Sequence, residues 1–281
     1  MIDYGLIVTS IAVSSKISVT PLQGALGAVV EGLDVPSLSD GDLSDVAAEL
    51  AALWSRFLVL FFPAIDLSPA DQVRLAARFG SRLAATTETD SDYRKSPTLA
   101  EEGFPQILVL DSGTDRFDAR QTAVWHTDVT FAANPPKGSL LCMEIPATSG
   151  GDTMWSNQMR AYESLSEPIR GLIGELTAVH GRPPLTGTTS HPMVITHHET
   201  GDPVLFVNRG FTSAINDLSS TESSNLLAAI FAIAERPEHQ IRWKWSAGDA
   251  ALWDNRYTMH YAVNDYAGQR RRVRRTTIYQ D

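Results

Sequence analysis

Two residues with metal-binding side chains stand close together near the middle of the chain. His126 and Asp128 lie in the string WHTDVTF. On a strand, or at its end, side chains two residues apart point to the same side, so this imidazole and carboxylate can meet at one point. His260, which follows the string WDNRYTM, offers a third ligand. Two histidines and one carboxylate that leave coordination positions open form the facial triad of non-haem Fe(II) oxygenases.

Other interpretations of the histidines and of the one cysteine have to be weighed. A buried histidine oriented by a neighbouring carboxylate is a common core feature, and an H-x-D string leaves that alternative open. His197 and His198 precede the turn-forming string TGDP, so we expect them at an exposed hairpin and outside any metal site. Cys142 is the only cysteine, which excludes an intramolecular disulfide and Cys-based zinc or iron–sulfur sites. A reducing, cytoplasmic setting fits this composition.

An arginine-rich string near the end of the sequence is the next candidate for chemistry. In RRRVRR, Arg271 and Arg275 share one face of an expected strand, and the intervening arginines share the other. An arginine directed into a barrel needs an anion, because an uncompensated buried charge is costly. At about 3.3 Å per residue the two side chains lie roughly 13 Å apart, so they can hold two different anions. Pairing with the protein's own carboxylates is the alternative.

Length and composition limit the class of protein. The chain has 281 residues, of which 43% are hydrophobic and 20% charged, with a net charge of −10. This composition indicates a globular protein that needs no disulfide to hold its core, and its acidity argues against a nucleic-acid partner. The apolar run 6–13 is too short to span a bilayer and lacks a preceding basic region, so we expect no membrane partner and no signal peptide. We expect one domain over 1–281, with 1–15 as a flexible leader.

Many short strands have to position these residues. Apolar and alternating runs predict strands at 17–21, 57–62, 107–110, 138–145, 151–155, 204–208, 241–245, 250–253 and 273–279. Helical spacing and capping residues predict helices at 43–57, 69–80, 167–179 and 221–235. Residues 81–123 are expected to form a long polar excursion around one strand. The pattern predicts an α+β, mainly β chain with a jelly-roll or cupin-like core and peripheral helices.

These strings together resemble the TauD/TfdA family of Fe(II)- and 2-oxoglutarate-dependent dioxygenases, most closely its taurine dioxygenase members. The resemblance runs from about residue 17 to the end and is carried by WHTDVTF at 125–131, GGDTMW at 150–155, VNRGFT at 207–212, WDNR at 253–256 and QRR at 269–271. It implies a double-stranded β-helix fold, Fe(II), 2-oxoglutarate and O₂ as cofactor and co-substrates, and a homodimer or homotetramer.

The resemblance also implies roles for single residues. Three of them match the iron ligands of the family: His126, Asp128 and His260. Thr153 and Arg271 match the residues that bind the distal carboxylate of 2-oxoglutarate. Arg275 matches the arginine that binds the anionic group of the substrate, and Phe211 matches an aromatic wall of the substrate pocket.

The implied reaction hydroxylates the carbon next to the anionic group of a small organic anion, while 2-oxoglutarate yields succinate and CO₂. With taurine or another alkylsulfonate, the product collapses to an aldehyde and sulfite. Three features differ from the taurine dioxygenases of the family. The His and Tyr with which those enzymes hold taurine are absent from 81–90, Thr122 stands where they have an Asn, and the segment 180–192 is shorter than theirs. We therefore expect the substrate to be a longer or more apolar anion than taurine. Alkyl sulfate esters and aryloxyalkanoates are alternative substrates. A metal-dependent cupin-type hydrolase or isomerase, or a non-catalytic jelly-roll binding protein, would be a different class.

Overall fold

A nine-stranded sheet forms the largest element of the protein. The computed structural model describes residues 17–22, 24–84, 97–114, 123–183 and 186–280. The strand order of the large sheet is β1 (Ser18–Pro21), β2 (Ala28–Glu31), β3 (Val59–Phe62), β15 (Ala250–Asp254), β7 (Gly138–Ile145), β17 (Arg272–Tyr279), β6 (Phe104–Asp111) and β5 (Thr98–Leu99), and β4 (Arg82–Ala84) pairs with β17. The expected leader 1–15, Thr122 and most of 81–90 lie outside the described residues.

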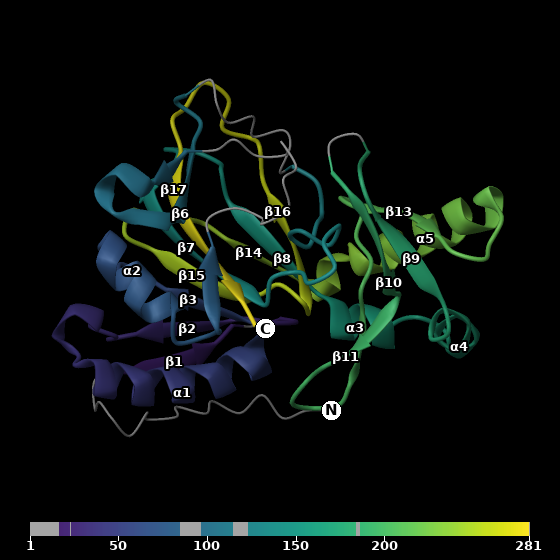
Figure 1. The fold of residues 1–281 in the computed structure, drawn as a ribbon, viewed down its shortest axis with the longest axis horizontal. Coiled ribbons are helices and arrows are strands. Elements are labelled where there is room, and N and C mark those ends of the chain that lie inside the picture. The colour runs from purple at the N-terminus through teal and green to yellow at the C-terminus, as the bar shows by residue number, and fades with distance from the viewer. Residues whose placement is uncertain (1–16, 23, 85–96, 115–122, 184–185, 281) are drawn as a thin grey trace.

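In the part of the chain that the structure describes, three smaller sheets accompany the large one (Figure 1). The first has the order β14 (Gln240–Trp243), β8 (Thr153–Asn157) and β16 (Thr258–Ala262). The second has the order β10 (Thr188–Pro192), β9 (Thr177–Gly181) and β13 (Thr212–Ile215), and the third pairs β11 (Val194–Thr196) with β12 (Pro203–Leu205). All pairings except β2 with β3 are antiparallel among these described strands.

The central strands of the large sheet are buried on both faces. In β15, Ala250 and Leu252 pack in the core that includes helix α1, whereas Ala251 and Trp253 pack in the core shared with β8 and β14. Side chains alternate between the two faces of a strand, so one continuous apolar run supplies both cores. The second core, closed by Trp155 from β8, lies between the large sheet and the β14–β8–β16 sheet. This layering is the mainly β, jelly-roll arrangement that the sequence predicts.

Helices cover the outer face of the large sheet and one end of the molecule (Figure 1). Their bounds are α1 (Asp40–Phe57), α2 (Pro69–Ala76), α3 (Gln158–Glu163), α4 (Glu167–Ile173) and α5 (Ser220–Ala234), with 3₁₀ turns η1 (Val35–Ser37), η2 (Ala100–Glu102) and η4 (Pro237–His239). The helix expected over 167–179 is wrong in its second half, because Thr177–Gly181 pairs on both sides with β10 and β13. Strand β6 is also longer than the expected 107–110.

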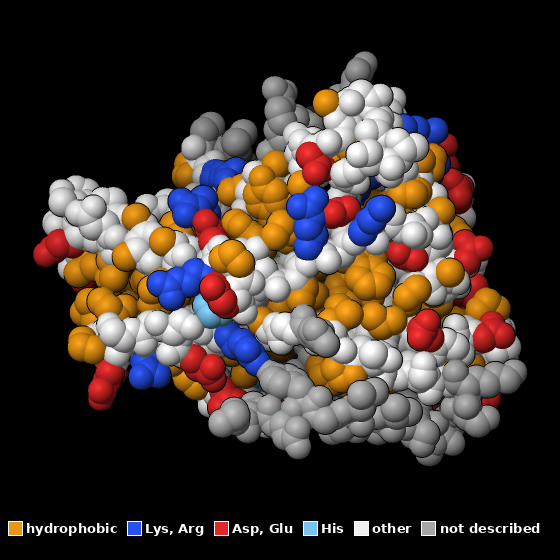
Figure 2. Space-filling model, turned by 180° about the vertical axis from the view of Figure 1, so that it is seen from behind, with side chains coloured by type: hydrophobic (Ala, Val, Ile, Leu, Met, Phe, Trp, Pro, Cys, Tyr) orange, Lys and Arg blue, Asp and Glu red, His pale blue; other side chains and the backbone are white. Residues whose placement is uncertain are grey.

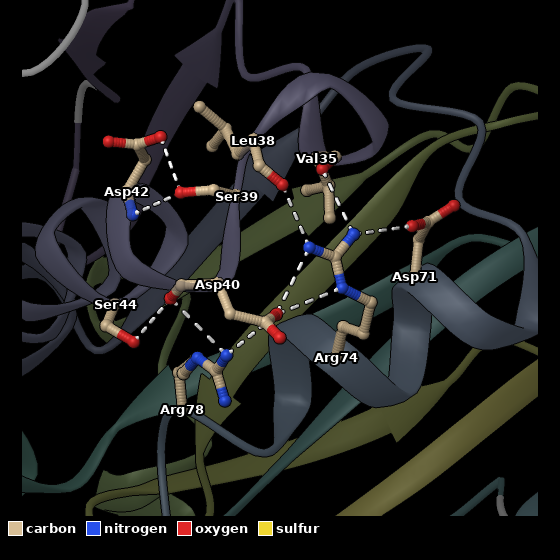
Figure 3. Close-up of polar contacts among 9 residues, drawn as sticks. All are labelled: Val35, Leu38, Ser39, Asp40, Asp42, Ser44, Asp71, Arg74 and Arg78. Carbon is tan, nitrogen blue, oxygen red and sulfur yellow. Dashed lines mark hydrogen bonds and ion pairs between the residues drawn. The ribbon is translucent and has the colours of Figure 1, made fainter.

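An ion-pair cluster joins the two helices on the outer face (Figure 3). Arg74 of α2 contacts Asp40 at the start of α1 at 3.3 Å and Asp71 at 3.2 Å, and it donates to the Leu38 carbonyl at 2.9 Å. Arg78 contacts the same Asp40 carboxylate at 3.1 Å. Helix α2 begins at residue 69, as the sequence predicts, whereas α1 begins three residues before the predicted 43. In both helices a serine side chain accepts a hydrogen bond from the backbone of the first turn.

The surface carries charges of both signs. Figure 2 shows acidic and basic side chains interspersed over the face seen from behind, with apolar side chains between them. Among the described residues, no helix combines the length and the apolar character that crossing a membrane requires.

Candidate active site

A short β-bridge brings the two candidate histidines together. The N–H of His126 donates to the carbonyl of His260 at 3.0 Å, and the N–H of His260 donates back at 2.7 Å. His260 lies on β16, whereas His126 lies on the segment that leads to β7. Asp128 follows two residues later, and the ligand atoms of the three buried side chains all lie within 4.8 Å of one another. The structure therefore places the expected triad at one point.

The histidine geometry suits metal binding. Nδ1 of His126 lies 2.7 Å from the carbonyl of Val124. Because a carbonyl only accepts, Nδ1 is the donor, and in the neutral ring Nε2 then keeps its lone pair. Nε2 of His126 lies 3.7 Å from Oδ1 of Asp128, and Nε2 of His260 lies 3.7 Å from Oδ2 of the same carboxylate. Two imidazole nitrogens and a carboxylate at this spacing form a donor set that fits Fe(II), with a backbone carbonyl orienting one ring.

Arg275 reaches the same point from β17. Its Nη1 donates to Oδ2 of Asp128 at 2.9 Å, and both side chains are buried. The structure thus shows for Arg275 the pairing with an internal carboxylate that the sequence left open as an alternative. A guanidinium has five N–H donors, so this contact is compatible with a second anion.

Arg271 lies where the chain enters β17 and has a different environment. Its Nε donates to the carbonyl of Gly151 at 2.9 Å, and its Nη2 lies 3.5 Å from Oγ1 of Thr153. That oxygen also accepts the indole N–H of Trp245 at 3.0 Å. Among the described residues, no carboxylate lies within ion-pair distance of Arg271, and burial lowers the pKa of its guanidinium. A buried cation with neutral neighbours is a site for an external anion.

The remaining arginines of the string face the other way. Arg272 and Arg274 both contact Glu144, at 2.8 and 2.9 Å. Arg270, just before the strand, pairs with Asp111 at 2.7 Å. The alternation predicted from the strand period is therefore confirmed. It directs Arg271 and Arg275 toward Thr153 and the triad, and the other three arginines toward Asp111 and Glu144.

An apolar cluster borders the triad on one side. Phe211 and Phe131 pack edge to face at 5.2 Å between ring centroids, and Val129 and Ala132 join them. The Phe211 ring lies 6.3 Å from the ring of His126. The expected wall residue therefore lies beside the candidate ligands, within an apolar surface that the sequence did not predict as a group.

Two other histidines contact residues 130–132 of this segment. Nε2 of His191 lies 2.8 Å from the carbonyl of Thr130 and 3.0 Å from that of Ala132. Nδ1 of His180 lies 2.9 Å from the Thr130 hydroxyl. Both histidines lie on the β9–β10 hairpin, and sequence reasoning missed them because only the hairpin pairing brings them to residues 130–132.

The expectation for His197 is wrong. The chain does turn here, at 198–200 between β11 and β12, but His197 is 1% exposed and its ring lies 4.2 Å from the Tyr257 ring at an interplanar angle of 30°. Its Nδ1 accepts the backbone N–H groups of Glu199 and Thr200, each at 3.3 Å. The side chain closes the turn from inside, because the β11–β12 hairpin packs against the core and not into solvent. His197 and His198 are absent from the cluster of candidate metal ligands found among the described residues.

Comparison with known proteins identifies relatives over most of the chain. Residues 18–277 match the family described as taurine catabolism dioxygenase TauD, TfdA family. The chain is 34% identical over 286 residues to an alpha-ketoglutarate-dependent sulfate ester dioxygenase of Pseudomonas putida, which covers 94% of this chain and 89% of that protein. It is also 34% identical over 289 residues to an alkylsulfatase of Acinetobacter baylyi, covering 94% and 86% respectively.

A solved structure supports the same relationship. A taurine dioxygenase from Burkholderia xenovorans superposes with a TM-score of 0.79 at 35% sequence identity, covering 95% of this chain and 92% of that one. The family match, the jelly-roll architecture and the clustered His–Asp–His donors agree. Alpha-ketoglutarate is a synonym of 2-oxoglutarate, so the expected co-substrate is the one that these relatives use. The chain therefore belongs to the TauD/TfdA family and is a dioxygenase that depends on Fe(II), 2-oxoglutarate and O₂.

Proposed function

We propose that the enzyme oxidises organic sulfate esters or alkylsulfonates that carry an apolar chain. The observation that carries this proposal is the placement of Arg275 and the Phe131–Phe211 cluster around one buried triad. An arginine suits a sulfate or sulfonate group, and the rings suit a hydrocarbon chain. The similarity to a sulfate ester dioxygenase and to an alkylsulfatase supports this substrate class.

Each proposed site residue has one task. His126, Asp128 and His260 would hold Fe(II), which supplies the oxidising chemistry together with 2-oxoglutarate and O₂. Arg271 and Thr153 would bind the distal carboxylate of 2-oxoglutarate, because the guanidinium and the hydroxyl lie together in a buried site with neutral neighbours.

Other residues beside the triad would orient the substrate. Arg275 would bind the anionic end, which places the adjacent carbon next to the metal ligands. Phe211 and its neighbours would pack along the chain and exclude water from the reacting carbon. Taurine has an ammonium group where this wall is apolar, so taurine should be the poorer substrate.

The products distinguish the substrate classes. Hydroxylation of the carbon next to a sulfate ester gives an unstable product that collapses to an aldehyde and sulfate, with succinate and CO₂ from 2-oxoglutarate. The same step on a sulfonate gives an aldehyde and sulfite. A metal-dependent hydrolase would instead release an alcohol and sulfate from the ester without consuming O₂.

The test compares hexyl sulfate, pentanesulfonate, taurine and an aryloxyalkanoate under identical Fe(II) and 2-oxoglutarate concentrations. We expect hexanal, sulfate and succinate in equal amounts from hexyl sulfate, and weak turnover of taurine. A strong preference for taurine or for the aryloxyalkanoate would overturn the substrate class. Formation of hexanol without O₂ would overturn the reaction.

Variants assign the roles. His126→Ala and Asp128→Ala should abolish turnover, because two remaining ligands hold Fe(II) poorly. Phe211→Ala should raise KM for hexyl sulfate more than for taurine. Arg275→Ala should raise KM for every anionic substrate, and it has to be measured at saturating metal because Arg275 also contacts Asp128. An unchanged KM for all of them would remove Arg275 from the substrate site.

The resemblance to the family also leads us to propose a homodimer or homotetramer. Light scattering of the purified enzyme tests this directly. A monomer at assay concentrations would contradict it.

A further inference from the structure

The turn that precedes His260 also holds the backbone of Asp128. We propose that Asn255 is a positioning residue that fixes the Asp128 carboxylate for metal binding. Asn255 lies between β15 and β16, and its side chain is completely buried. This inference rests on the proposed metal role of the His126, Asp128 and His260 side chains.

The Asn255 amide contacts both backbone groups of one residue. Its Oδ1 accepts the N–H of Asp128 at 2.8 Å, and its Nδ2 donates to the carbonyl of Asp128 at 3.0 Å. Nδ2 also donates to the carbonyl of Pro136 at 3.1 Å. Backbone N–H groups only donate and carbonyls only accept, so these three partners determine the orientation of the amide. Asp128 is held as a neighbouring strand would hold it, although it belongs to no strand.

The residue after Asp128 shows why such a hold is needed. Val129 has a φ of 60°, in the left-handed region that β-branched residues rarely adopt. A residue in such a conformation is strained and persists only where its surroundings impose it. The hydrogen bond from Asn255 to the Asp128 carbonyl holds the peptide group between Asp128 and Val129. Without it, the backbone could relax and turn the carboxylate away from the histidines.

The turn that carries Asn255 is itself braced. The carboxylate of Asp254 accepts the N–H of Arg256 at 2.9 Å and its guanidinium at 3.1 and 2.7 Å. The hydroxyl of Thr258 donates to the Asp254 carbonyl at 2.6 Å. The hydroxyl of Thr127 donates across to the Thr258 carbonyl at 3.0 Å. The Asn255 amide therefore extends from a well-held turn, and the Thr127–Thr258 bond joins the two ligand-bearing segments at a third point, after the His126–His260 bridge and the Asn255–Asp128 contacts.

A matched control separates positioning from general stabilisation. Asn157 is also buried and also makes three hydrogen bonds to backbone groups. Its Nδ2 donates to the carbonyl of Ala25 at 2.8 Å, and its Oδ1 accepts the N–H groups of Met159 and Arg160 at 2.9 and 3.2 Å. None of these partners is a candidate metal ligand. Asn157→Ala and Asn255→Ala thus remove equal numbers of hydrogen bonds to backbone groups.

The experiment titrates metal-free protein with Co(II), whose visible absorption reports the ligand geometry, and records the melting temperature of each metal-free variant. We expect both variants to melt below the wild type. We expect only Asn255→Ala to lose Co(II) affinity, by about 10- to 100-fold, the usual effect of removing a group that orients a ligand. Its absorption spectrum should change as well, whereas Asn157→Ala should keep the wild-type affinity and spectrum.

Several outcomes would overturn the proposal. Wild-type Co(II) affinity in a folded Asn255→Ala protein removes the positioning role. If that variant does not fold, Asn255→Asp is tested, since it keeps the acceptor for the Asp128 N–H but places a carboxylate oxygen against two carbonyls, and it should also lose affinity. If neither variant folds, amide hydrogen exchange of the wild-type protein tests the contact between Asn255 and the Asp128 N–H. Fast exchange of the Asp128 amide contradicts the proposal, and protection from exchange supports it. A wild-type protein that binds no Co(II) refutes the metal site and with it the proposed function.

Discussion

Replacing Arg271 with methionine should change 2-oxoglutarate affinity and stability in different directions. The Arg271 side chain is 7% exposed, and its hydrogen-bonding neighbours, the carbonyl of Gly151 and the hydroxyl of Thr153, are neutral. Burial already lowers the pKa of the guanidinium. Because a buried charge without a counter-ion costs folding free energy, methionine should leave the ligand-free protein at least as stable as the wild type.

The loss in binding should be large. Removing one partner of a buried, hydrogen-bonded charge pair costs roughly 2–5 kcal/mol. At about 1.4 kcal/mol per tenfold change, the dissociation constant for 2-oxoglutarate should rise by roughly 30-fold to several-thousand-fold. Calorimetric titration of the Mn(II)-loaded protein with 2-oxoglutarate in the absence of O₂ measures this constant. Thermal unfolding of the ligand-free protein measures the stability.

The neighbouring arginine supplies the control. Arg270 is paired with Asp111 at 2.7 Å, and this hydrogen bond holds the pKa of the Asp111 carboxyl below its ordinary value. Arg270→Met should therefore lower stability at neutral pH and leave 2-oxoglutarate affinity unchanged. Wild-type affinity for 2-oxoglutarate in Arg271→Met would refute the reasoning, as would a strong loss of ligand-free stability in that variant.

Three further perturbations test other parts of the site and fold. A Cβ on Gly210 would lie 2.5 Å from Cβ of His126, so Gly210→Ala should weaken Co(II) binding, and an unchanged titration would contradict the close approach. His197→Ala should lower the melting temperature, because it removes a turn contact and the ring contact with Tyr257, and turnover should stay near wild type. Loss of turnover at full metal loading would contradict a purely structural role for His197. Burial lowers the pKa of His180 from 6.5 to about 3, so the unfolded chain takes up a proton first, and stability should fall as the pH drops from 6.5 toward 3. The free energy of unfolding should change by up to about 1.4 kcal/mol per pH unit in this range. In urea unfolding measured across the range, His180→Gln should make this pH dependence shallower. An equally steep pH dependence in the variant would exclude His180 as the cause.

Local signals predicted those parts of the fold that depend on neighbouring residues. Ser39 and Ser68 accept the capping hydrogen bonds that start α1 and α2. The run VLFF is buried at every position, as expected for a strand between two layers. Helix caps and side-chain alternation depend on residues only a few positions apart, so the helices and strands that they specify can be predicted without knowing the partner strands.

Elements that depend on distant partners were predicted poorly. Residues 177–179 were predicted as the end of a helix, yet they belong to strand β9, because β10 and β13 supply hydrogen bonds on both sides. His197 carries turn residues after it but lies in the core, because Tyr257 packs over it from the turn between β15 and β16. Pairing and burial of this kind depend on segments that meet only in the folded chain.

The candidate site shows the same division. The donor types and their local spacing are evident from the residues: an imidazole and a carboxylate on one side of a short segment, and two arginines on one face of a strand, because backbone geometry sets those directions. The pairing of His260 with His126, the contacts of Arg275 with Asp128 and of Arg271 with Thr153, and the hold of Asn255 on a residue 127 positions away arise only when the chain folds. These contacts follow from the order in which strands assemble into sheets. Sequence periodicity carries no information about that order.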